Sequence, residues 1–299
     1  MKIGITGIRG YIGSSLARAC RTAGHTVVGF SRSTNAASPE ADEMRVLRDG
    51  EGDLSGLDAL VLLGHEPIFG IWTPEKAKRV WNSRVETTEK LRNTLEKLDA
   101  AERPGVLVSA SGIAIYGDRG DEWLSEEAGK GKREYFTDLT EAWEREVLLA
   151  EKLGVRPVCA RIGVVLGKDS PACNLFGKVF GMGLGGKLGS GRQWFSWIGS
   201  QDLTQMLFRA IEDSSISGPI NCVSPNPVRN AEMTHLIGKT LNRPTLIPAP
   251  AFGVKLAFRE LSQALLSSQR VDPAFWKGRD FEWEVDSIET AFAEAFGKA

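Results

Sequence analysis

Residues 2–13 have the sequence KIGITGIRGYIG, and this stretch predicts the fold of the chain. Lys2 to Thr6 alternates apolar and small residues, a pattern typical of a short buried strand. The glycine-rich run from Gly7 to Gly13 leads into an amphipathic segment, about Tyr11 to Ala23, that predicts a helix. A strand, a glycine turn and a helix in this order form the first half of a dinucleotide-binding unit.

The three glycines of the turn meet different physical requirements. Gly7 permits the tight turn, Gly10 lets the backbone approach a pyrophosphate, and Gly13 lets the helix lie close to the strand. The N–H groups and partial positive charge of the helix N-terminus then favour phosphate. Glycines at this spacing also occur in ordinary turns, but here the strand and the helix stand where the binding mechanism needs them. The residues expected to bind the dinucleotide in this stretch are Thr6, Gly7, Arg9, Gly10, Tyr11, Ile12 and Gly13.

The composition excludes several classes of protein. The 299 residues carry a net charge of -1, so no basic excess indicates nucleic acid or an acidic membrane surface as a partner. The four cysteines form no CxxC pair, which predicts reduced core thiols and no metal site. Gly7 to Gly13 interrupts any signal peptide, and no apolar run is long enough to cross a bilayer. We therefore expect a cytoplasmic protein.

The end of the second predicted strand indicates which dinucleotide is bound. The strand covers Thr26 to Phe30, and Ser31, Arg32 and Ser33 follow it. An NAD site usually has an acidic residue at this position, whereas an arginine accommodates the 2′-phosphate of NADP. Arg32, with the two serines and Arg9 nearby, therefore favours NADP(H), although a solvated arginine at a strand end is the plain alternative.

Strands and helices alternate along the first 165 residues. Strands are predicted at Ala59 to Leu63, Val106 to Ser109 and Arg156 to Val165, with helices from Thr73 to about Leu98 and from about Tyr135 to Leu153. This order predicts an α/β fold with a Rossmann-type, doubly wound parallel sheet and ligands at the carboxyl ends of its strands. The residues at these strand ends that we expect to bind the cofactor are Leu63, Gly64, His65, Ser109, Ala110, Arg161, Ile162 and Gly163. A lone histidine is more often a loop residue, so His65 receives no catalytic role.

The composition changes after Gly167. Gly181 to Gly191 is rich in glycine, and RQWFSW follows at residues 192–197, which favours a binding loop or a mobile lid over a spacer. We expect a dinucleotide-binding domain at residues 1–165, to which the chain returns at about 196–223. Residues 166–195 and 224–299 would form a smaller C-terminal α/β domain on the substrate side. In it, Ala251 to Leu266 predicts a helix, Thr245 to Ile247 a possible strand, and the alternation of Phe281, Trp283 and Val285 a last strand.

The motifs resemble those of the extended short-chain dehydrogenase/reductases, a family that includes nucleotide-sugar epimerases. The resembling stretches are Thr6 to Gly13, Ser109-Ala110-Ser111 with Tyr116-Gly117, Arg161 to Gly167, and Asp202-Leu203. One subgroup is more similar still, the atypical "epimerase family" proteins with a C-terminal domain of unknown function. Its signatures are recognisable at 66–68, 72–73, 83–88, 116–122, 143–144, 183–186, 189–194, 225–228, 230–232 and 269–271.

The resemblance implies site residues, and the chain also departs from the family pattern. Ser111 would hydrogen-bond the substrate, Tyr116 or Tyr135 would serve as the acid, and Glu66, Arg192, Gln193 and Trp194 would bind the substrate. Ordinary members carry a Tyr-x-x-x-Lys pair, whose lysine lowers the tyrosine pKa and holds the ribose. Phe136 and Thr140 stand at those two positions here, and His65 stands where the subgroup usually has glycine.

Two functions remain open at this point. The chain is either an NADP(H)-dependent oxidoreductase or epimerase acting on a small molecule, or a non-catalytic NADP(H)-binding protein that senses redox state or regulates a partner. The missing Tyr-x-x-x-Lys pair favours the second function, whereas the aromatic loop at 192–197 favours the first. We expect a monomer or a homodimer.

Overall fold

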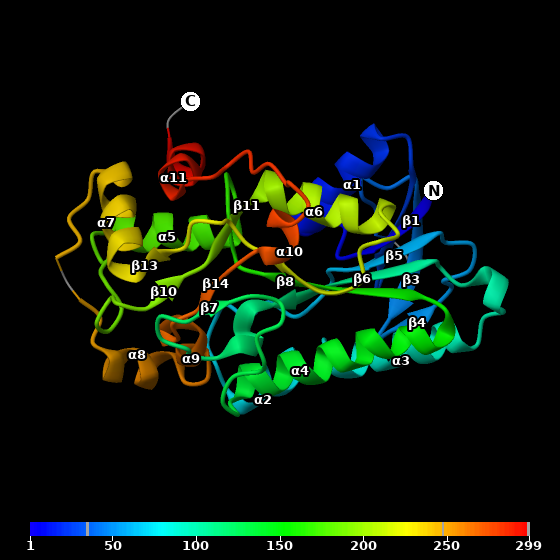
Figure 1. Ribbon diagram of the computed structural model, residues 1–299, viewed down its shortest axis with the longest axis horizontal. Helices are drawn as coiled ribbons and strands as arrows, with labels where there is room; N and C mark the ends of the chain where they lie inside the picture. Colours follow the sequence, from blue (N-terminus) through cyan, green and yellow to red (C-terminus); the bar gives the residue numbers. More distant parts are fainter. Residues whose placement is uncertain (34–35, 247, 298–299) are drawn as a thin grey trace. The chain divides into compact units, whose positions relative to one another are not determined.

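The computed structural model describes residues 1–33, 36–246 and 248–297. Its main feature is an eight-stranded sheet with the strand order β12-β8-β6-β5-β1-β2-β3-β4 (Figure 1). The bounds of these strands, in that order, are Gly218–Cys222, Arg156–Ile162, Val106–Gly112, Ala59–Leu62, Lys2–Thr6, Thr26–Ser31, Glu43–Arg48 and Glu51–Gly52. β1 pairs in parallel with β2 and with β5, while β4 forms an antiparallel hairpin with β3. The predicted Rossmann-type sheet is confirmed.

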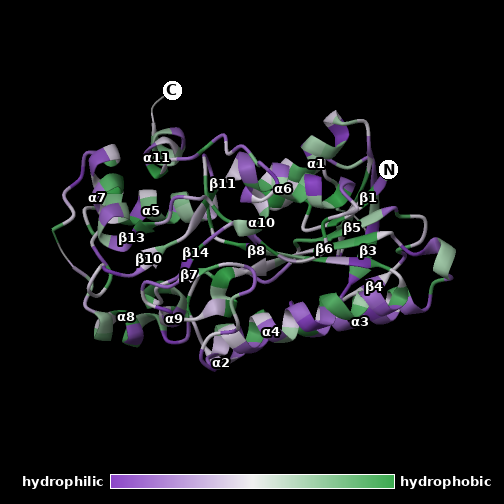
Figure 2. Ribbon diagram, viewed as in Figure 1, coloured by the Kyte–Doolittle hydropathy of each residue, from purple (hydrophilic) through white to green (hydrophobic). Residues whose placement is uncertain are grey.

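Helices cover both faces of this sheet. Figure 1 shows α1 (Tyr11–Thr22) and α6 (Ser200–Glu212) on one side of the strands, and α3 (Val85–Glu96) and α4 (Tyr135–Leu148) on the other. Ile3, Ile5 and Val61 are fully buried between the two helix layers, and the hydropathy colouring in Figure 2 shows the same hydrophobic strands. Short 3-10 helices lie at Ala100–Glu102, Ile113–Tyr116 and Leu149–Leu153.

The helix expected from Thr73 to about Leu98 is two helices, which corrects the sequence prediction. α2 covers Pro74–Asn82 and α3 begins at Val85. At the break, the Ser83 and Arg84 side chains both donate hydrogen bonds to the carbonyl oxygen of Val80, at 3.0 and 3.2 Å. These polar side chains favour the break because they compete with the main-chain hydrogen bonds of a continuous helix.

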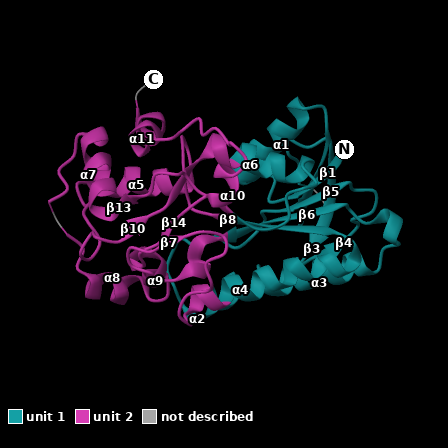
Figure 3. Ribbon diagram, viewed as in Figure 1, with its two compact units in different colours: residues 1–111, 139–160, 204–220 teal, residues 112–138, 161–203, 221–299 magenta. Residues whose placement is uncertain are grey.

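The chain divides into two compact units, coloured separately in Figure 3. The first unit contains residues 1–111, 139–160 and 204–220, and the second contains residues 112–138, 161–203 and 221–299. The domain boundaries expected from the sequence stay a prediction.

The second unit has its own hydrophobic core, in which Trp197, Ile237 and Phe292 are completely buried. Side chains of α5 (Pro171–Gly181), α7 (Asn230–Leu241) and α11 (Ile288–Phe296) contribute to this core. The unit also contains α8 (Ala251–Phe258), α9 (Leu261–Leu266) and α10 (Ala274–Lys277). Its small sheets pair β10 (Trp194–Phe195) with β13 (Val228–Arg229), β11 (Trp197–Gly199) with β9 (Val164–Leu166), and β14 (Arg270–Val271) with β7 (Trp123–Leu124).

Three local expectations for this unit need correction. The helix expected from Ala251 to Leu266 is interrupted at Arg259, whose φ is 48°. No described residue of the segment 281–285 lies in a strand, because the N–H groups of Glu284 and Val285 bond the Asp202 carboxylate instead of a neighbouring strand. Thr245 and Leu246 are outside any strand, and Ile247 lies outside the described residues.

Cys20, Cys159, Cys173 and Cys222 are all buried, and no disulfide bond joins any of these four residues. Within the described residues, no helix combines the length and the apolar character that crossing a membrane requires.

Candidate functional site

The glycine turn between β1 and α1 has the geometry expected of a phosphate cradle. Gly7 has a φ of 67°, and its carbonyl oxygen accepts a 2.8 Å hydrogen bond from the Gly10 N–H. A Cβ on Gly13 would lie 2.3 Å from that carbonyl oxygen, so only glycine lets α1 approach the turn so closely. Gly10 is exposed, and a Cβ there would contact only the same oxygen, at 3.1 Å. Its outer side is therefore open to a ligand.

A cleft of about 820 Å³ lies beside this turn, within the first unit. Its walls are Thr6 to Gly10, Phe30 to Arg32 at the end of β2, Leu47, Asp49 and Gly50 after β3, Leu62 to Pro67 after β5, and residues of α2 and α3. The cleft thus lies at the carboxyl ends of β1, β2 and β5, where the strand order reverses and open α/β sheets bind ligands. Its volume suits a ligand of cofactor size.

Arg32 is the cation at the end of β2. Its side chain is exposed at the cleft, and its carbonyl oxygen accepts a 3.0 Å hydrogen bond from the Arg48 Nε. The Ser31 hydroxyl oxygen accepts a 3.1 Å hydrogen bond from the Ser33 N–H, which shapes the turn around Arg32. Arg9, also exposed, lines the cleft on the side of the glycine turn.

Thr6 joins the ends of β1 and β5. Its hydroxyl oxygen accepts hydrogen bonds from the N–H groups of Leu63 and Gly64, both at 3.0 Å. The expected cofactor residues that line the cleft are Thr6, Gly7, Arg9, Gly10, Ser31, Arg32, Leu63, Gly64 and His65. Among the described residues, the wall of the cleft does not include Tyr11, Ile12, Gly13, Ser33, Ser109, Ala110 or Ser111.

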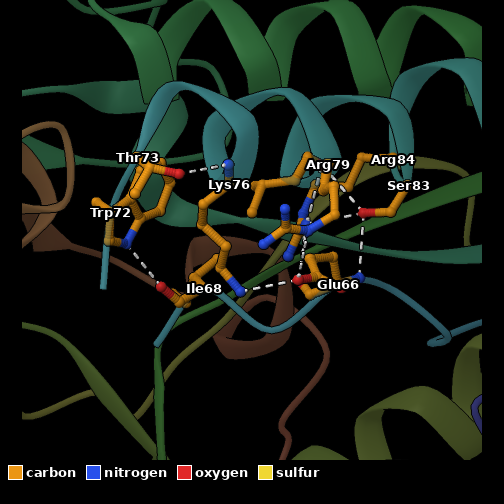
Figure 4. Close-up of polar contacts among 9 residues, drawn as sticks. Glu66, Ile68, Trp72, Thr73, Lys76, Arg79, Ser83 and Arg84 are labelled. Carbon is orange, nitrogen blue, oxygen red and sulfur yellow. Dashed lines mark hydrogen bonds and ion pairs between the residues drawn. The ribbon is translucent and has the colours of Figure 1, made fainter. Parts of the chain in front are cut away.

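Glu66 anchors the segment that follows β5, as the close-up in Figure 4 shows. Its Oε1 accepts hydrogen bonds from the Lys76 Nζ at 2.9 Å and the Arg79 Nε at 3.4 Å. Its N–H donates to the Ser83 hydroxyl at 3.1 Å, and its carbonyl oxygen accepts from an Arg84 terminal nitrogen at 3.0 Å. The hydrogen bond from Lys76 is the main cause of the lowered pKa of the Glu66 carboxyl. Its contacts therefore support a positioning role beside the expected role in substrate binding.

The same segment is also fixed at its far end. Thr73 caps α2 by accepting a 3.2 Å hydrogen bond from the Lys76 N–H, and the indole N–H of Trp72 donates to the Ile68 carbonyl at 2.8 Å (Figure 4). Lys76 is buried, whereas the Glu66 side chain is 31% exposed, so only the lysine end of their ion pair is shielded from water. The Thr73 cap agrees with the helix start predicted at Thr73, whereas the ion pair of Lys76 with Glu66 joins a loop to a later helix turn and does not follow from local sequence pattern.

His65 packs against α4. Its ring meets Trp143 edge-on, with the ring centroids 4.5 Å apart, and the Arg84 guanidinium lies 5.4 Å from the centroid of the same indole. Burial and the positive charge of Arg84 lower the pKa of His65 well below its ordinary value, so its ring is neutral at neutral pH.

The residues at the end of β6 are buried in the first unit. The Ser109 hydroxyl donates to the neighbouring Ala110 carbonyl at 2.8 Å. The Ser111 hydroxyl donates to the Glu144 carboxylate on α4 at 2.6 Å, and both side chains are buried. This pairing was not evident from the sequence, and it weighs against a direct role of Ser111 with substrate.

Tyr116 belongs to a buried network of the second unit. Its hydroxyl donates to the Asn221 Oδ1 at 2.7 Å and accepts from an Arg161 nitrogen at 3.0 Å, and its side chain is completely buried. Burial raises the pKa of Tyr116, and likewise that of Glu126, whose Oε1 accepts from the Asn221 N–H. This environment favours a structural role for Tyr116 and Arg161 and weighs against the expected roles in proton transfer and cofactor binding.

The other expected residues of the second unit differ in exposure. The ring of Tyr135 is partly exposed and contacts Phe136 edge-on. Gly163 donates its N–H to the Cys222 carbonyl at 3.2 Å, and Ile162 ends β8 beside it. Gln193 is buried and donates its side-chain amide to the Leu188 carbonyl at 3.1 Å, whereas Arg192 is exposed.

Trp194 lies in a stack of aromatic rings and guanidinium groups. Arg229 and Arg270 lie over its ring, at 3.9 and 4.2 Å from the centroid, and Arg270 lies 3.9 Å from the centroid of Trp123. The Trp194 indole N–H donates to Asp121 at 2.9 Å, and Asp121 also pairs with Arg229 at 2.7 Å. Asp121 and Arg270 belong to the family signatures at 116–122 and 269–271, but their contacts with Trp194 were not evident from the sequence because these segments are far apart in the chain.

Comparison with known proteins agrees with this architecture. Residues 3–222 match the NAD dependent epimerase/dehydratase family, and residues 249–295 match a domain of unknown function, DUF1731. A chloroplastic "epimerase family protein SDR39U1 homolog" of Arabidopsis thaliana is 35% identical over 298 residues, which cover 97% of this chain and 85% of that protein. The "epimerase family protein YfhF" of Bacillus subtilis is 31% identical, over 98% of this chain and 97% of that protein.

A solved structure matches along the whole length. The crystal structure of human epimerase family protein SDR39U1 (isoform 2) with NADPH has a TM-score of 0.86 and 28% sequence identity, with 100% of both chains covered. The resemblance inferred from the glycine turn and the later motifs is thereby confirmed. The chain belongs to the NAD dependent epimerase/dehydratase family, within the group of epimerase family proteins that resemble SDR39U1.

Proposed function

We propose that this protein binds NADP(H) in the cleft beside the glycine turn and acts as an oxidoreductase or epimerase on a small molecule. The observation that carries the proposal is Arg32, exposed at the end of β2 and lining the cleft, at the position where a cation accommodates a 2′-phosphate. The human relative crystallised with NADPH supports the same cofactor.

The residues of the cleft fit such a dinucleotide. The open side of Gly10 and the N-terminus of α1 would hold the pyrophosphate, because the first N–H groups of a helix attract anions. Arg32, with Ser31, Ser33 and Arg9, would hold the 2′-phosphate through charge-assisted hydrogen bonds. Bound NADPH would supply a hydride to an acceptor.

The proton would come from a residue other than the usual lysine-assisted tyrosine. Phe136 and Thr140, at the positions of the family's tyrosine and lysine, are both buried and carry no acidic proton. Tyr135, adjacent and partly exposed, is the residue that we assign as proton donor. We assign substrate recognition to Arg192. Residues 1–165 would bind the dinucleotide, and residues 166–195, which include Arg192, would form the substrate side together with residues 224–299.

A non-catalytic NADP(H) sensor is the second candidate. The observations that favour it are the buried Phe136 and Thr140, together with the engagement of the Tyr116 and Ser111 hydroxyls in buried hydrogen bonds.

Two measurements test the proposal. Titration with NADPH and NADH, followed by cofactor fluorescence, should give clearly tighter binding of NADPH, and equal affinities would refute the cofactor assignment. Hydride transfer from bound NADPH to a panel of carbonyl compounds and quinones should then give turnover with at least one class. Binding without any turnover across the panel would favour the sensor.

A further inference from the structure

His65 lines the wall of the cleft. It follows β5 at the carboxyl end of the sheet and lines the cleft between Gly64 and Glu66. Its neighbour Glu66 is held by Lys76, Arg79, Ser83 and Arg84, so the backbone that carries the imidazole is tightly positioned (Figure 4).

Burial and, after it, the positive charge of Arg84 hold the His65 imidazole in the neutral form. Arg84 is kept in place by hydrogen bonds to the carbonyl oxygens of Glu66 and Val80, at 3.0 and 3.2 Å, and it disfavours a second positive charge on His65. The Glu66 carboxylate is paired with Lys76 and Arg79. A neutral imidazole has one nitrogen that donates and one that accepts a hydrogen bond.

Across residues 1–33, 36–246 and 248–297, no side chain or main-chain group forms a hydrogen bond with either ring nitrogen of His65. The ring packs edge-on against the indole of Trp143, with the two ring centroids 4.5 Å apart. Trp143 is buried and offers the ring an apolar support. The imidazole is therefore positioned by packing, and its hydrogen-bonding groups remain available to a ligand in the cleft.

The strand order indicates which part of a dinucleotide would meet His65. Arg32 follows β2 and the glycine turn follows β1, while His65 follows β5 on the opposite side of β1 from β2. A dinucleotide with its 2′-phosphate at Arg32 and its pyrophosphate at the turn would place its nicotinamide half toward β5. That half carries a ribose with two adjacent hydroxyl groups.

We propose that the His65 imidazole hydrogen-bonds a ribose hydroxyl in the nicotinamide half of the bound dinucleotide, and so replaces the lysine that holds this ribose in ordinary members of the family. The inference rests on the proposed function, since it requires NADP(H) in the cleft. Thr140 at the lysine position is buried and too short to act as a lysine would.

The first test compares two probes that share the 2′-phosphate. NADPH contains the second ribose, whereas adenosine 2′,5′-bisphosphate does not. His65→Gly, which restores the residue usual in the subgroup, should weaken NADPH about 3- to 10-fold and leave the bisphosphate unchanged. His65→Gln retains a donor and an acceptor and should lose less. His235→Gln, on α7 of the second unit, is the matched control and should bind both probes normally.

The second test uses the unmutated protein, so it does not depend on how well the variants fold. The chain has three histidines, and ¹⁵N labelling of their rings gives a signal for each. NADPH should shift the His65 ring signals, the bisphosphate should leave them in place, and His25 should respond to neither probe. Normal NADPH binding with unmoved His65 signals, or equal losses of both probes in His65→Gly, would overturn the inference. Absence of NADPH binding by the unmutated protein would overturn the proposed function with it.

Discussion

The Ser111 hydroxyl donates a 2.6 Å hydrogen bond to the Glu144 carboxylate, and the two side chains are buried where β6 meets α4. A buried carboxylate needs such donors because it has lost its water. Ser111 therefore supports the helix that carries Trp143, and through Trp143 the ring of His65.

Removing this hydroxyl should destabilise the protein. Ser111→Ala removes one hydrogen-bond donor of the Glu144 carboxylate, at an expected cost of about 1.5 to 3 kcal/mol in the free energy of unfolding. Ser109→Ala on the same strand is the control, since its hydroxyl bonds only the adjacent Ala110 carbonyl and its loss should cost clearly less. Denaturant unfolding measures both variants. An equal loss of unfolding free energy in the two variants would show that the Ser111–Glu144 hydrogen bond has no special importance for stability. If Ser111→Ala kept its stability but lost turnover, Ser111 would have a catalytic role.

The two turn glycines should separate binding from folding. Gly10→Ala adds a Cβ on the open side of the turn, so the variant should fold and yet bind NADPH at least about tenfold more weakly. Gly13→Ala places the same atom 2.3 Å from the Gly7 carbonyl oxygen and should destabilise the fold. Thermal unfolding and cofactor titration of the pair test this contrast. Unchanged NADPH affinity in Gly10→Ala would mean that the turn is purely structural.

Arg32 should discriminate between the two dinucleotides. Arg32→Ala removes the cation proposed for the 2′-phosphate, so NADPH affinity should fall by about 1.5 to 3 kcal/mol, while NADH affinity stays nearly unchanged. Arg133→Ala, in the second unit and with a 91% exposed side chain, controls for the general loss of positive charge. A parallel fall in NADH affinity would show that Arg32 does not contact the 2′-phosphate.

Asp202 should make stability depend on pH. Burial raises its pKa from 3.8 to about 6, although the N–H groups of Glu284 and Val285 bond its carboxylate. The folded state therefore binds a proton more readily than the unfolded state, and the contribution of Asp202 to stability grows as the pH falls from about 6 to about 4, by up to about 3 kcal/mol.

The measurement compares how the free energy of unfolding of two variants depends on pH. Asp202→Asn should flatten this part of the stability profile, whereas Glu282→Gln, at an exposed carboxylate of the same segment, should not. A comparison with the unmutated protein is needed because a second group titrates in this range. His65, with its lowered pKa, acts in the opposite direction and reduces the stability of the folded state as the pH falls below 6.5. An unchanged profile in Asp202→Asn would show that the carboxyl titrates normally in the folded protein.

The direction of the reaction should follow from the missing lysine. A tyrosine hydroxyl without such help is protonated at neutral pH, so it can donate a proton but is a poor base. Reduction of an activated carbonyl should therefore be faster than oxidation of the alcohol, and Tyr135→Phe should slow reduction. Rates in both directions at neutral and alkaline pH test this, and efficient alcohol oxidation at neutral pH would point to another base.

Neighbouring residues in the sequence were enough to predict the dinucleotide half of this protein. The strand Lys2 to Thr6, the glycine turn, α1 and Arg32 lie within about thirty residues of one another, and each follows from local geometry or periodicity. The α/β alternation and the family motifs extended the prediction to the whole sheet.

The tertiary structure decided the chemistry of the side chains, because their partners are distant in the chain. Ser111 meets Glu144, Tyr116 meets Asn221 and Arg161, and His65 meets Trp143 only after the strands and helices have packed. Periodicity says that a residue is buried but not which polar group it finds there. The break in the helix at Ser83 is an exception, since its hydrogen bond to Val80 is local. The absence of a strand at 281–285, in contrast, depends on hydrogen bonds to Asp202, which is far away in the chain and which no local pattern specifies.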